Sequence, residues 1–293
     1  MFFLKILVLA VVQGAAELLP VSSSAHVIIA EKFLGLNPTA PSMTLLLVML
    51  HTGTMFAVIF YFWKSWKKTF FGSWKDFKNS AILVAAATFL TGSVGLLLME
   101  VIEKLVLGGP HAQVEQIFGN LTIIGSGLAV AGVLILISGW KGRGAGAETS
   151  EGKEGNQLDM KGSCLIGAVQ GLCLPFRGFS RSGATISTGL ILGMKRMPAE
   201  EFSFALAVVL TPPVIVRELW RILKAHHMSL MNLPGTAGLL YPSLLGMVFS
   251  FISGLIALRW LSKWLLGGRW YFFGIYCLAA SAAVFAFHVM GGI

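Results

Sequence analysis

QGAAELLPVSSSAH, residues 13–26, sets a run of polar side chains inside the first apolar segment of the chain, which covers roughly residues 1–35. Proline lacks a backbone donor and moves the residue before it out of helical geometry, so Pro20 ends a helix here. We therefore expect two short helices that meet at a polar turn. Gln13 and Glu17 are four residues apart, so they share one face of the first helix.

The residues that follow this break supply further polar groups. Ser22 is placed to cap the second helix, and Ser23 and His26, three residues apart, share a face of that helix. A serine next to a histidine provides a nucleophile and a base within reach of each other. Two plainer readings stay open: the serines serve only close helix packing, and His26 is a hydrogen-bonded core residue.

A second apolar segment is interrupted in the same way by LPFRGFSRSGATIS, residues 174–187, where the break falls at Pro175. Ser180 is placed to cap the helix that follows, with Arg181 in its first turn and Thr185 one turn further on. The backbone N–H groups of a helix N-terminus bind anions, and a planar guanidinium matches a phosphate. This pattern predicts a phosphate-binding turn.

Glu17 and Arg181 both carry a charge within apolar segments. A charge at the centre of a bilayer costs ~2.5–3.5 kcal/mol even on the lenient insertion scale, so such groups pair with each other, with a ligand or with water. A structural ion pair is therefore the plain alternative to a phosphate site. His51, in VMLHTGT, is a weaker candidate for lining the same site.

The composition of the 293-residue chain places it among membrane proteins, because it is 56% hydrophobic and only 12% charged. The net charge of +9 is scattered between apolar blocks, which argues against a nucleic-acid-binding face. The three cysteines show neither metal spacing nor a disulfide pattern. The N-terminus is like a signal peptide, but polar residues interrupt it and we expect it to be retained.

Six further blocks are apolar enough to span a bilayer, which takes ~20 helical residues. We expect these spans at residues 42–62, 81–99, 117–139, 200–220, 238–260 and 270–290. Lys and Arg gather at 64–80, 140–161, 195–196 and 259–269. The positive-inside rule then places these loops in the cytoplasm and both termini outside, provided that the two broken segments re-enter on the side where they began.

The two broken segments resemble each other. Val12-Gln13-Gly14 matches Val169-Gln170-Gly171, and Ser22-x-Ser24 matches Ser180-x-Ser182. Three spans follow each segment, so the second half enters the membrane inverted. The predicted fold is an all-α polytopic membrane protein with six transmembrane helices, two re-entrant hairpins and an inverted-topology repeat. Chance similarity between two apolar, glycine-rich stretches is the alternative. The predicted domains are a first repeat at 1–140 with its hairpin at 1–35, a cytoplasmic linker at 141–161, and a second repeat at 162–293 with its hairpin at 162–195.

On QGAAELLPVSSSAHVII (13–29) and GFSRSGATIS (178–187), supported by EFSFALAV (201–208), the sequence resembles the undecaprenyl-diphosphate phosphatase family, the bacitracin-resistance proteins of bacterial inner membranes. The resemblance covers the whole chain. It implies six spans with two inverted re-entrant hairpins and a site that faces the periplasm. It also implies removal of the terminal phosphate from undecaprenyl diphosphate, which recycles the lipid carrier of cell-wall synthesis.

The resemblance also implies roles for residues of the two motifs. Ser23 is similar to the family's proposed nucleophile, His26 to its acid/base, and Glu17 to its second acidic residue. Arg181 matches the catalytic arginine of the second motif. Phosphate binding is expected from Gln13, Ser22, Ser180, Arg181, Ser182 and Thr185.

Three positions depart from the family pattern. Gln13 stands where many members have a Glu, which puts a two-carboxylate metal site in doubt, although Glu17 remains a candidate ligand for Mg²⁺ or Ca²⁺. Arg177 stands near the usual Pro in a turn that is one residue longer, and His51 stands where many members have Gln.

The sequence hypothesis is thus a lipid diphosphate phosphatase of the bacterial inner membrane that acts on a polyprenyl diphosphate and not on nucleic acid. No cofactor is certain, and the oligomeric state is left open. A polyprenyl phosphate flippase is the alternative, because inverted repeats and broken helices are common among transporters. The acid-phosphatase type of lipid phosphatase is disfavoured, since no later His–Asp pair follows Arg181.

Overall fold

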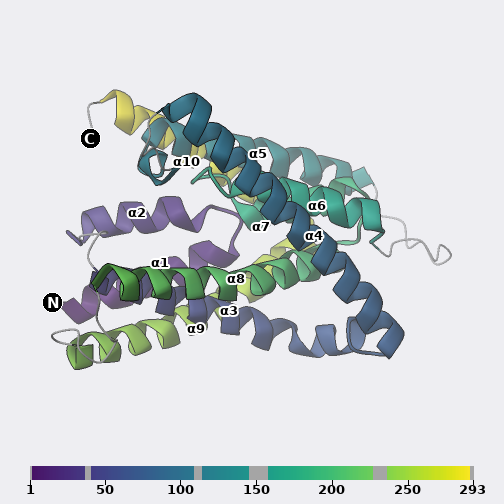
Figure 1. The fold of residues 1–293 in the computed structure, drawn as a ribbon. Coiled ribbons are helices and arrows are strands. Elements are labelled where there is room, and N and C mark those ends of the chain that lie inside the picture. The colour runs from purple at the N-terminus through teal and green to yellow at the C-terminus, as the bar shows by residue number, and fades with distance from the viewer. Residues whose placement is uncertain (1, 37–40, 109–113, 145–157, 227–235, 291–293) are drawn as a thin grey trace. The chain divides into compact units, whose positions relative to one another are not determined.

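The computed structural model describes residues 2–36, 41–108, 114–144, 158–226 and 236–290, and within these ranges it is helical with no strand (Figure 1). The helical elements, in chain order, are α1 (Phe2–Leu18), α2 (Ser23–Phe33), α3 (Pro41–Thr69), α4 (Trp74–Val101), the π-helical turn η1 (Ile102–Leu107), the 3₁₀ turn η2 (Val114–Ile117), α5 (Leu121–Gly144), α6 (Met160–Cys173), α7 (Arg181–Ile191), α8 (Arg196–His226), α9 (Thr236–Leu266) and α10 (Tyr271–Val289).

Among the residues that the structure describes, six helices are long and apolar enough to cross a membrane, in agreement with the predicted number of spans. They contain Met43–Thr69, Trp74–Leu107, Leu121–Trp140, Arg196–Arg217, Tyr241–Leu266 and Tyr271–Val289. Large apolar side chains remain exposed along them, such as Phe89 at 71% and Leu96 at 69%. Exposed apolar surface of this extent is what lipid, rather than water, covers.

Both apolar segments with internal prolines are broken as predicted. The first forms α1 and α2, which contact each other, and the second forms α6 and α7, which also contact each other. The helix α2 and the helix α7 have 11 residues each, about 16 Å at 1.5 Å per residue, which is too short for a bilayer core. Ser22 lies directly before α2 with a φ of +67°, not in the extended geometry of the usual N-cap.

The chain forms two compact units, each made of separate segments. Unit 1 contains Met1–Leu19, Ser23–Lys64 and Ala207–Trp260, and unit 2 contains Pro20–Ser22, Ser65–Leu206 and Leu261–Ile293. The helices α3, α8 and α9 therefore contribute residues to both units. This division follows packing rather than internal similarity, so the predicted repeats at 1–140 and 162–293 stay a prediction. Most of the predicted linker at 141–161, namely 145–157, lies outside the described residues.

In unit 1, α9 packs closely on α1 and α3 through glycines. A Cβ at Gly53 would lie 2.3 Å from the Met247 carbonyl oxygen, and one at Gly14 would lie 2.6 Å from the Ser250 carbonyl oxygen. Apolar side chains of α1, α2 and α3 complete the core. They are Ile6, Leu9, Ala10, Val27, Met43, Leu46 and Leu50. Figure 1 shows α1 and α2 as an antiparallel pair.

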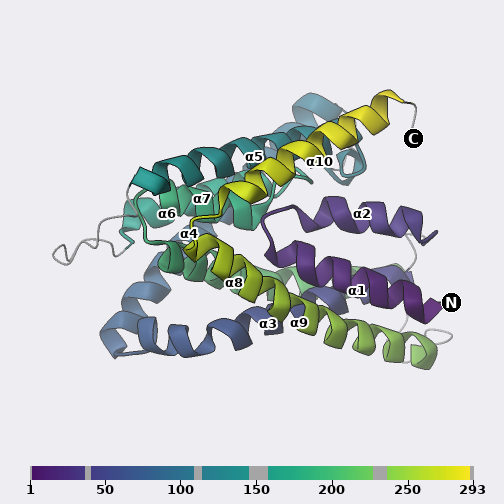
Figure 2. The same ribbon diagram turned by 180° about the vertical axis from the view of Figure 1, so that it is seen from behind.

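In unit 2, small residues again let helices approach, as is common between membrane helices. The backbones of α6 and α4 are in contact at Gly167, where a Cβ would lie 2.2 Å from the Ala87 carbonyl oxygen of α4. The Thr91 hydroxyl donates to the Gly167 carbonyl oxygen over 2.9 Å. The helices α5 and α10 lie side by side in both views (Figures 1 and 2).

Candidate functional site

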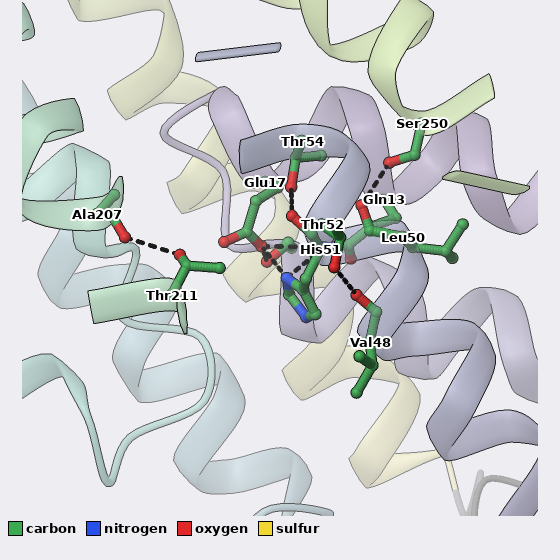
Figure 3. Close-up of polar contacts among 11 residues, drawn as sticks. Gln13, Glu17, Val48, Leu50, His51, Thr52, Thr54, Ala207, Thr211 and Ser250 are labelled. Atoms are coloured by element: carbon green, nitrogen blue, oxygen red, sulfur yellow. Dashed lines mark hydrogen bonds and ion pairs between the residues drawn. The ribbon is translucent and has the colours of Figure 1, made fainter. Parts of the chain in front are cut away.

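Four side chains of unit 1 meet around one carboxylate oxygen, Glu17 Oε2. The Ser23 hydroxyl donates to it over 2.5 Å, and the Gln13 amide nitrogen donates to it over 3.2 Å. His51 Nδ1 lies 3.7 Å from the same oxygen and 2.9 Å from Gln13 Nε2. We call Gln13, Glu17, Ser23 and His51 the Glu17 cluster. Figure 3 shows the Gln13, Glu17 and His51 side chains turned toward one another.

The helix α9 holds the two helices that carry most of this cluster. The Ser253 hydroxyl donates to the Val11 carbonyl oxygen of α1, and the Ser250 hydroxyl donates to the Leu50 carbonyl oxygen of α3, each over 2.9 Å. These bonds lie next to Gln13 and His51 in the chain. The packing of α1, α3 and α9 therefore fixes the distance between the Gln13 and His51 side chains.

The Gln13 amide joins Glu17 and His51 in one hydrogen-bond network. The amide group has two N–H donors, and its nitrogen faces both Glu17 Oε2 and His51 Nδ1. Gln13 is 1% exposed, so its amide has a fixed place beneath the carboxylate. Glu17 Oε2 is thus held between the Gln13 amide and the Ser23 hydroxyl, both of which donate to it.

The sequence placed His26 and Ser22 beside Ser23. His26 is half-buried on α2, one turn beyond Ser23, whose hydroxyl donates to Glu17. Ser22 is 5% exposed and directly precedes Ser23. The sequence singled out Ser23 and Glu17 together, but it treated His51 as a weaker candidate. The sequence could have pointed to His51 more strongly, because His51 is a polar residue on the first full span and such residues commonly pair with an intramembrane charge, here Glu17.

The second motif lies in unit 2, in the turn between α6 and α7. Ser180 is the N-cap of α7, as predicted: its φ is −60° and its ψ is 117°, and its Oγ accepts from the Gly183 N–H over 3.2 Å. Gly178 has a φ of +103°, and a Cβ there would lie 2.2 Å from the Ile124 carbonyl oxygen. Only glycine fits this position, so the turn is pressed against α5.

The start of α7 presents Arg181 and Ser182, both half-buried, beside the Ser180 cap. The Ser180 and Ser182 hydroxyls are 3.4 Å apart. Backbone N–H groups at this helix N-terminus and the guanidinium form an arrangement that suits phosphoryl oxygens. Thr185 is 1% exposed, and its hydroxyl bonds to the Arg181 carbonyl oxygen over 2.8 Å and to Ser203 Oγ over 2.6 Å. Its hydroxyl therefore joins α7 to α8 in this structure.

Three further residues around this turn were not assigned by the sequence. Ser203, on α8, was missed as the partner of Thr185. Gln170, on α6, is 2% exposed, and its Nε2 has no hydrogen-bond partner among the described residues, so it is an available buried donor. Arg177 lies with its guanidinium carbon 4.4 Å from the centre of the Phe118 ring. This cation–π contact holds the Arg177 guanidinium against the Phe118 ring.

The sequence did not decide whether this protein binds a divalent cation. Within the described ranges, no group of three or more His, Cys, Asp or Glu side chains gathers to hold a metal ion. Glu17 is the one carboxylate of the Glu17 cluster, and Gln13 turns its amide nitrogen toward it. Mg²⁺ takes oxygen ligands and is often bound by one or two carboxylates together with substrate phosphates. Glu17 alone therefore fits such an ion only with phosphoryl oxygens of a substrate as further ligands.

Comparisons with known proteins cover the parts of the chain that contain both motifs. The family model described as bacitracin resistance protein BacA matches residues 6–283. A protein of Acinetobacter baylyi named undecaprenyl-diphosphatase 2 is 57% identical over 286 residues, with 97% of each chain covered. An undecaprenyl-diphosphatase of Korarchaeum cryptofilum is 32% identical over 95% of this chain and 96% of its own, and one of Desulforapulum autotrophicum is 32% identical over 92% of both. The matched residues 6–283 include the Glu17 cluster and the second turn, and this chain belongs to the bacitracin resistance protein BacA family.

Proposed function

We propose that this protein is a membrane-embedded undecaprenyl-diphosphatase that releases inorganic phosphate and undecaprenyl phosphate. The single observation that carries the proposal is the Ser23 hydroxyl held 2.5 Å from the Glu17 carboxylate. A hydroxyl bonded to an adjacent base is how proteins activate a weak oxygen nucleophile. The names of three relatives that cover nearly the whole chain support the substrate.

In the proposed reaction, Ser23 Oγ attacks the terminal phosphorus of the diphosphate while Glu17 takes the hydroxyl proton. The new Oγ–P bond forms as the bridging P–O bond breaks, and undecaprenyl phosphate leaves. A water molecule then attacks the phosphoserine and releases inorganic phosphate. His26, one turn along α2, is the candidate for moving the proton to the leaving group or from the water.

Gln13 and His51 act on Glu17 rather than on the substrate. Gln13 donates to Glu17 Oε2 and also bonds His51 Nδ1, which lies 3.7 Å from Oε2, so the two side chains hold the carboxylate toward the serine. Direct binding of phosphate by Gln13, which the sequence predicts, is the alternative to this assignment. A divalent cation, if the reaction uses one, would bind Glu17 and phosphoryl oxygens and would neutralise charge on the diphosphate.

Phosphate binding is assigned to the first turn of α7. Phosphoryl transfer depends mainly on positioning and on stabilisation of the charge that spreads over the equatorial oxygens. Arg181, Ser182 and the N–H groups that follow Ser180 supply such stabilisation. Ser180 itself holds the turn in shape as its N-cap. We assign Thr185 to the same task, because its hydroxyl bonds the Arg181 carbonyl oxygen and so fixes the residue that carries the guanidinium.

The membrane arrangement belongs to the same proposal. The short helices α1 with α2 and α6 with α7 would form two re-entrant hairpins within an inverted repeat, since 11-residue helices are too short to span. The site would face the periplasm of a bacterial inner membrane, as the charge distribution over the loops favours. There the reaction would recycle the carrier for peptidoglycan synthesis and counter bacitracin.

A phosphate-release assay tests this function against the flippase alternative. The purified protein is reconstituted in liposomes that contain undecaprenyl diphosphate, and released phosphate and the leaflet distribution of the lipid are both measured. We expect catalytic release of one phosphate per lipid. Movement of polyprenyl phosphate between leaflets without phosphate release would replace this function with transport.

A further inference from the structure

Two neighbouring carboxyl groups lie buried at the start of α8, in unit 2. Glu200 is 0% exposed and Glu201 is 4% exposed. Both belong to the candidate span Arg196–Arg217. The surrounding protein already excludes water from them before any lipid is considered. The reaction proposed above gives neither residue a role.

Each carboxyl group receives one hydroxyl from another helix. The Ser262 hydroxyl of α9 donates to Glu200 Oε1 over 2.5 Å, and the Ser65 hydroxyl of α3 donates to Glu201 Oε1. The second oxygen of Glu200, Oε2, is fully buried and has no hydrogen-bond partner among the described residues. Glu200 Oε2 is therefore a buried acceptor for which the described residues supply no donor.

No cationic side chain of the described residues forms an ion pair with either group. On the helices that hold them, Lys67 and Lys68 of α3 and Lys263 of α9 are exposed. Arg196 of α8 donates its Nη1 to the Leu266 carbonyl oxygen over 2.8 Å.

Two buried charges without counter-charge are not stable. The effective penalty for removing one ion from water is several kcal/mol even after relaxation, and a second negative charge next to it adds repulsion. One serine hydroxyl for each carboxyl group offsets only part of this cost. Uptake of a proton or binding of a small cation would remove the remaining negative charge.

We propose that Glu200 is the centre of a small-cation site in which the carboxyl group takes a proton or Na⁺ on its buried Oε2. Ser262 positions the group through Oε1, and Glu201 adds the negative field that favours a cation. Carboxylate and hydroxyl oxygens are hard ligands, so both H⁺ and Na⁺ have the right chemistry. Either ion would leave the pair with at most one net negative charge.

The thermal unfolding of the full-length protein in detergent tests the site, since a ligand that binds only the folded state raises Tm. In the first arm, NaCl replaces choline chloride at constant pH and ionic strength. In the second arm, pH is varied at constant salt. We expect the Tm of the wild type to rise by several degrees with Na⁺ if the ion is sodium, or with acid if it is a proton.

Glu200→Gln keeps the shape of the side chain but holds no cation, so its Tm should lose the response in whichever arm the wild type shows it. Ser262→Ala should weaken that response, whereas Ser281→Ala should keep it. Ser281 is a matched control, because it is also a buried serine that donates to a neighbouring helix, at the Gly125 carbonyl oxygen. A wild-type Tm that stays constant in both arms overturns the proposal, as does an unchanged response in Glu200→Gln.

A second measurement keeps the proposal testable if Glu200→Gln does not fold. Infrared difference spectra of the wild type, recorded between NaCl and choline chloride and between high and low pH, report carboxyl groups directly. We expect a carboxyl band that changes with one of the two ions and is altered in Glu201→Gln. Spectra without such a band in either comparison would overturn the site.

Discussion

The Ser23 hydroxyl donates to Glu17 Oε2 over 2.5 Å, across the turn that separates α1 from α2. The two residues are only six positions apart, yet a continuous helix would not place their side chains together in this way. The break at Pro20 brings the start of α2 beside the end of α1. The turn thereby brings a hydroxyl and a carboxylate from two helices into one hydrogen bond.

Ser23→Ala removes the proposed nucleophile. We expect kcat for phosphate release to fall by at least ~10³-fold with little change in Tm, because no neighbouring side chain takes over the role of a lost nucleophile. Ser24→Ala is the matched control, since it deletes the next hydroxyl of the same helix, and it should keep kcat within about threefold. Equal rates for Ser23→Ala and the wild type would remove Ser23 from the mechanism.

Glu17→Gln keeps the size of the side chain but removes the base. A general base contributes about 10²–10⁴-fold, so kcat should fall by that factor while the lipid still binds. Steady-state kinetics with a soluble short-chain polyprenyl diphosphate give kcat and KM separately. A rise in KM alone would show that Glu17 binds the substrate and does not accept the proton.

His51 is proposed to position Glu17 and Gln13 rather than to bind the substrate. Replacing it with Ala should lower kcat by about 10-fold, the usual effect of losing a side chain that orients a reacting group. His51→Gln should retain more activity, because its amide oxygen can accept the Gln13 N–H in place of Nδ1. If both variants lose the same activity, His51 does not act by accepting the hydrogen bond from the Gln13 amide.

Arg181 is expected to stabilise phosphoryl charge through its planar guanidinium. Arg181→Ala should lower kcat/KM by about 10²–10³-fold, as seen when an oxyanion donor is lost. Arg181→Lys should recover only part of this, because an ammonium group does not make the two parallel hydrogen bonds of Arg. Inhibition constants for inorganic phosphate, measured on each variant, should follow the same order. Full activity in Arg181→Lys would show that charge alone suffices.

A substitution at Gly53 tests whether close packing of α3 on α9 supports the Glu17 cluster. A Cβ there would lie 2.3 Å from the Met247 carbonyl oxygen, so Gly53→Ala should push α3 from α9 and destabilise the protein by about 1–3 kcal/mol. Gly92→Ala is the matched control, because a Cβ at Gly92 meets nothing within 4 Å and alanine favours helix. Thermal unfolding in detergent should lower Tm only for Gly53→Ala. A neutral Gly53→Ala would show that the α3–α9 packing yields easily.

The helices were predicted well because their signals are local. Six apolar blocks and two proline breaks are visible in the sequence, and the structure has six long apolar helices and two broken segments in those places. The N-cap role of Ser180 was predicted for the same reason, since a cap depends on residues three positions apart. The conformation of Ser22 was not, because its φ of +67° is imposed by the path of the turn.

The polar and charged residues within the membrane segments can be recognised from the sequence, because hydropathy and proline act within one segment of chain. Their partners depend on how the helices pack. His51, 38 residues from Gln13, reaches it because glycines and serines bring α1 and α3 onto α9, and Glu200 meets Ser262 only through helix packing. Contacts between distant residues depend on side-chain volume and close approach in three dimensions, which no local pattern records.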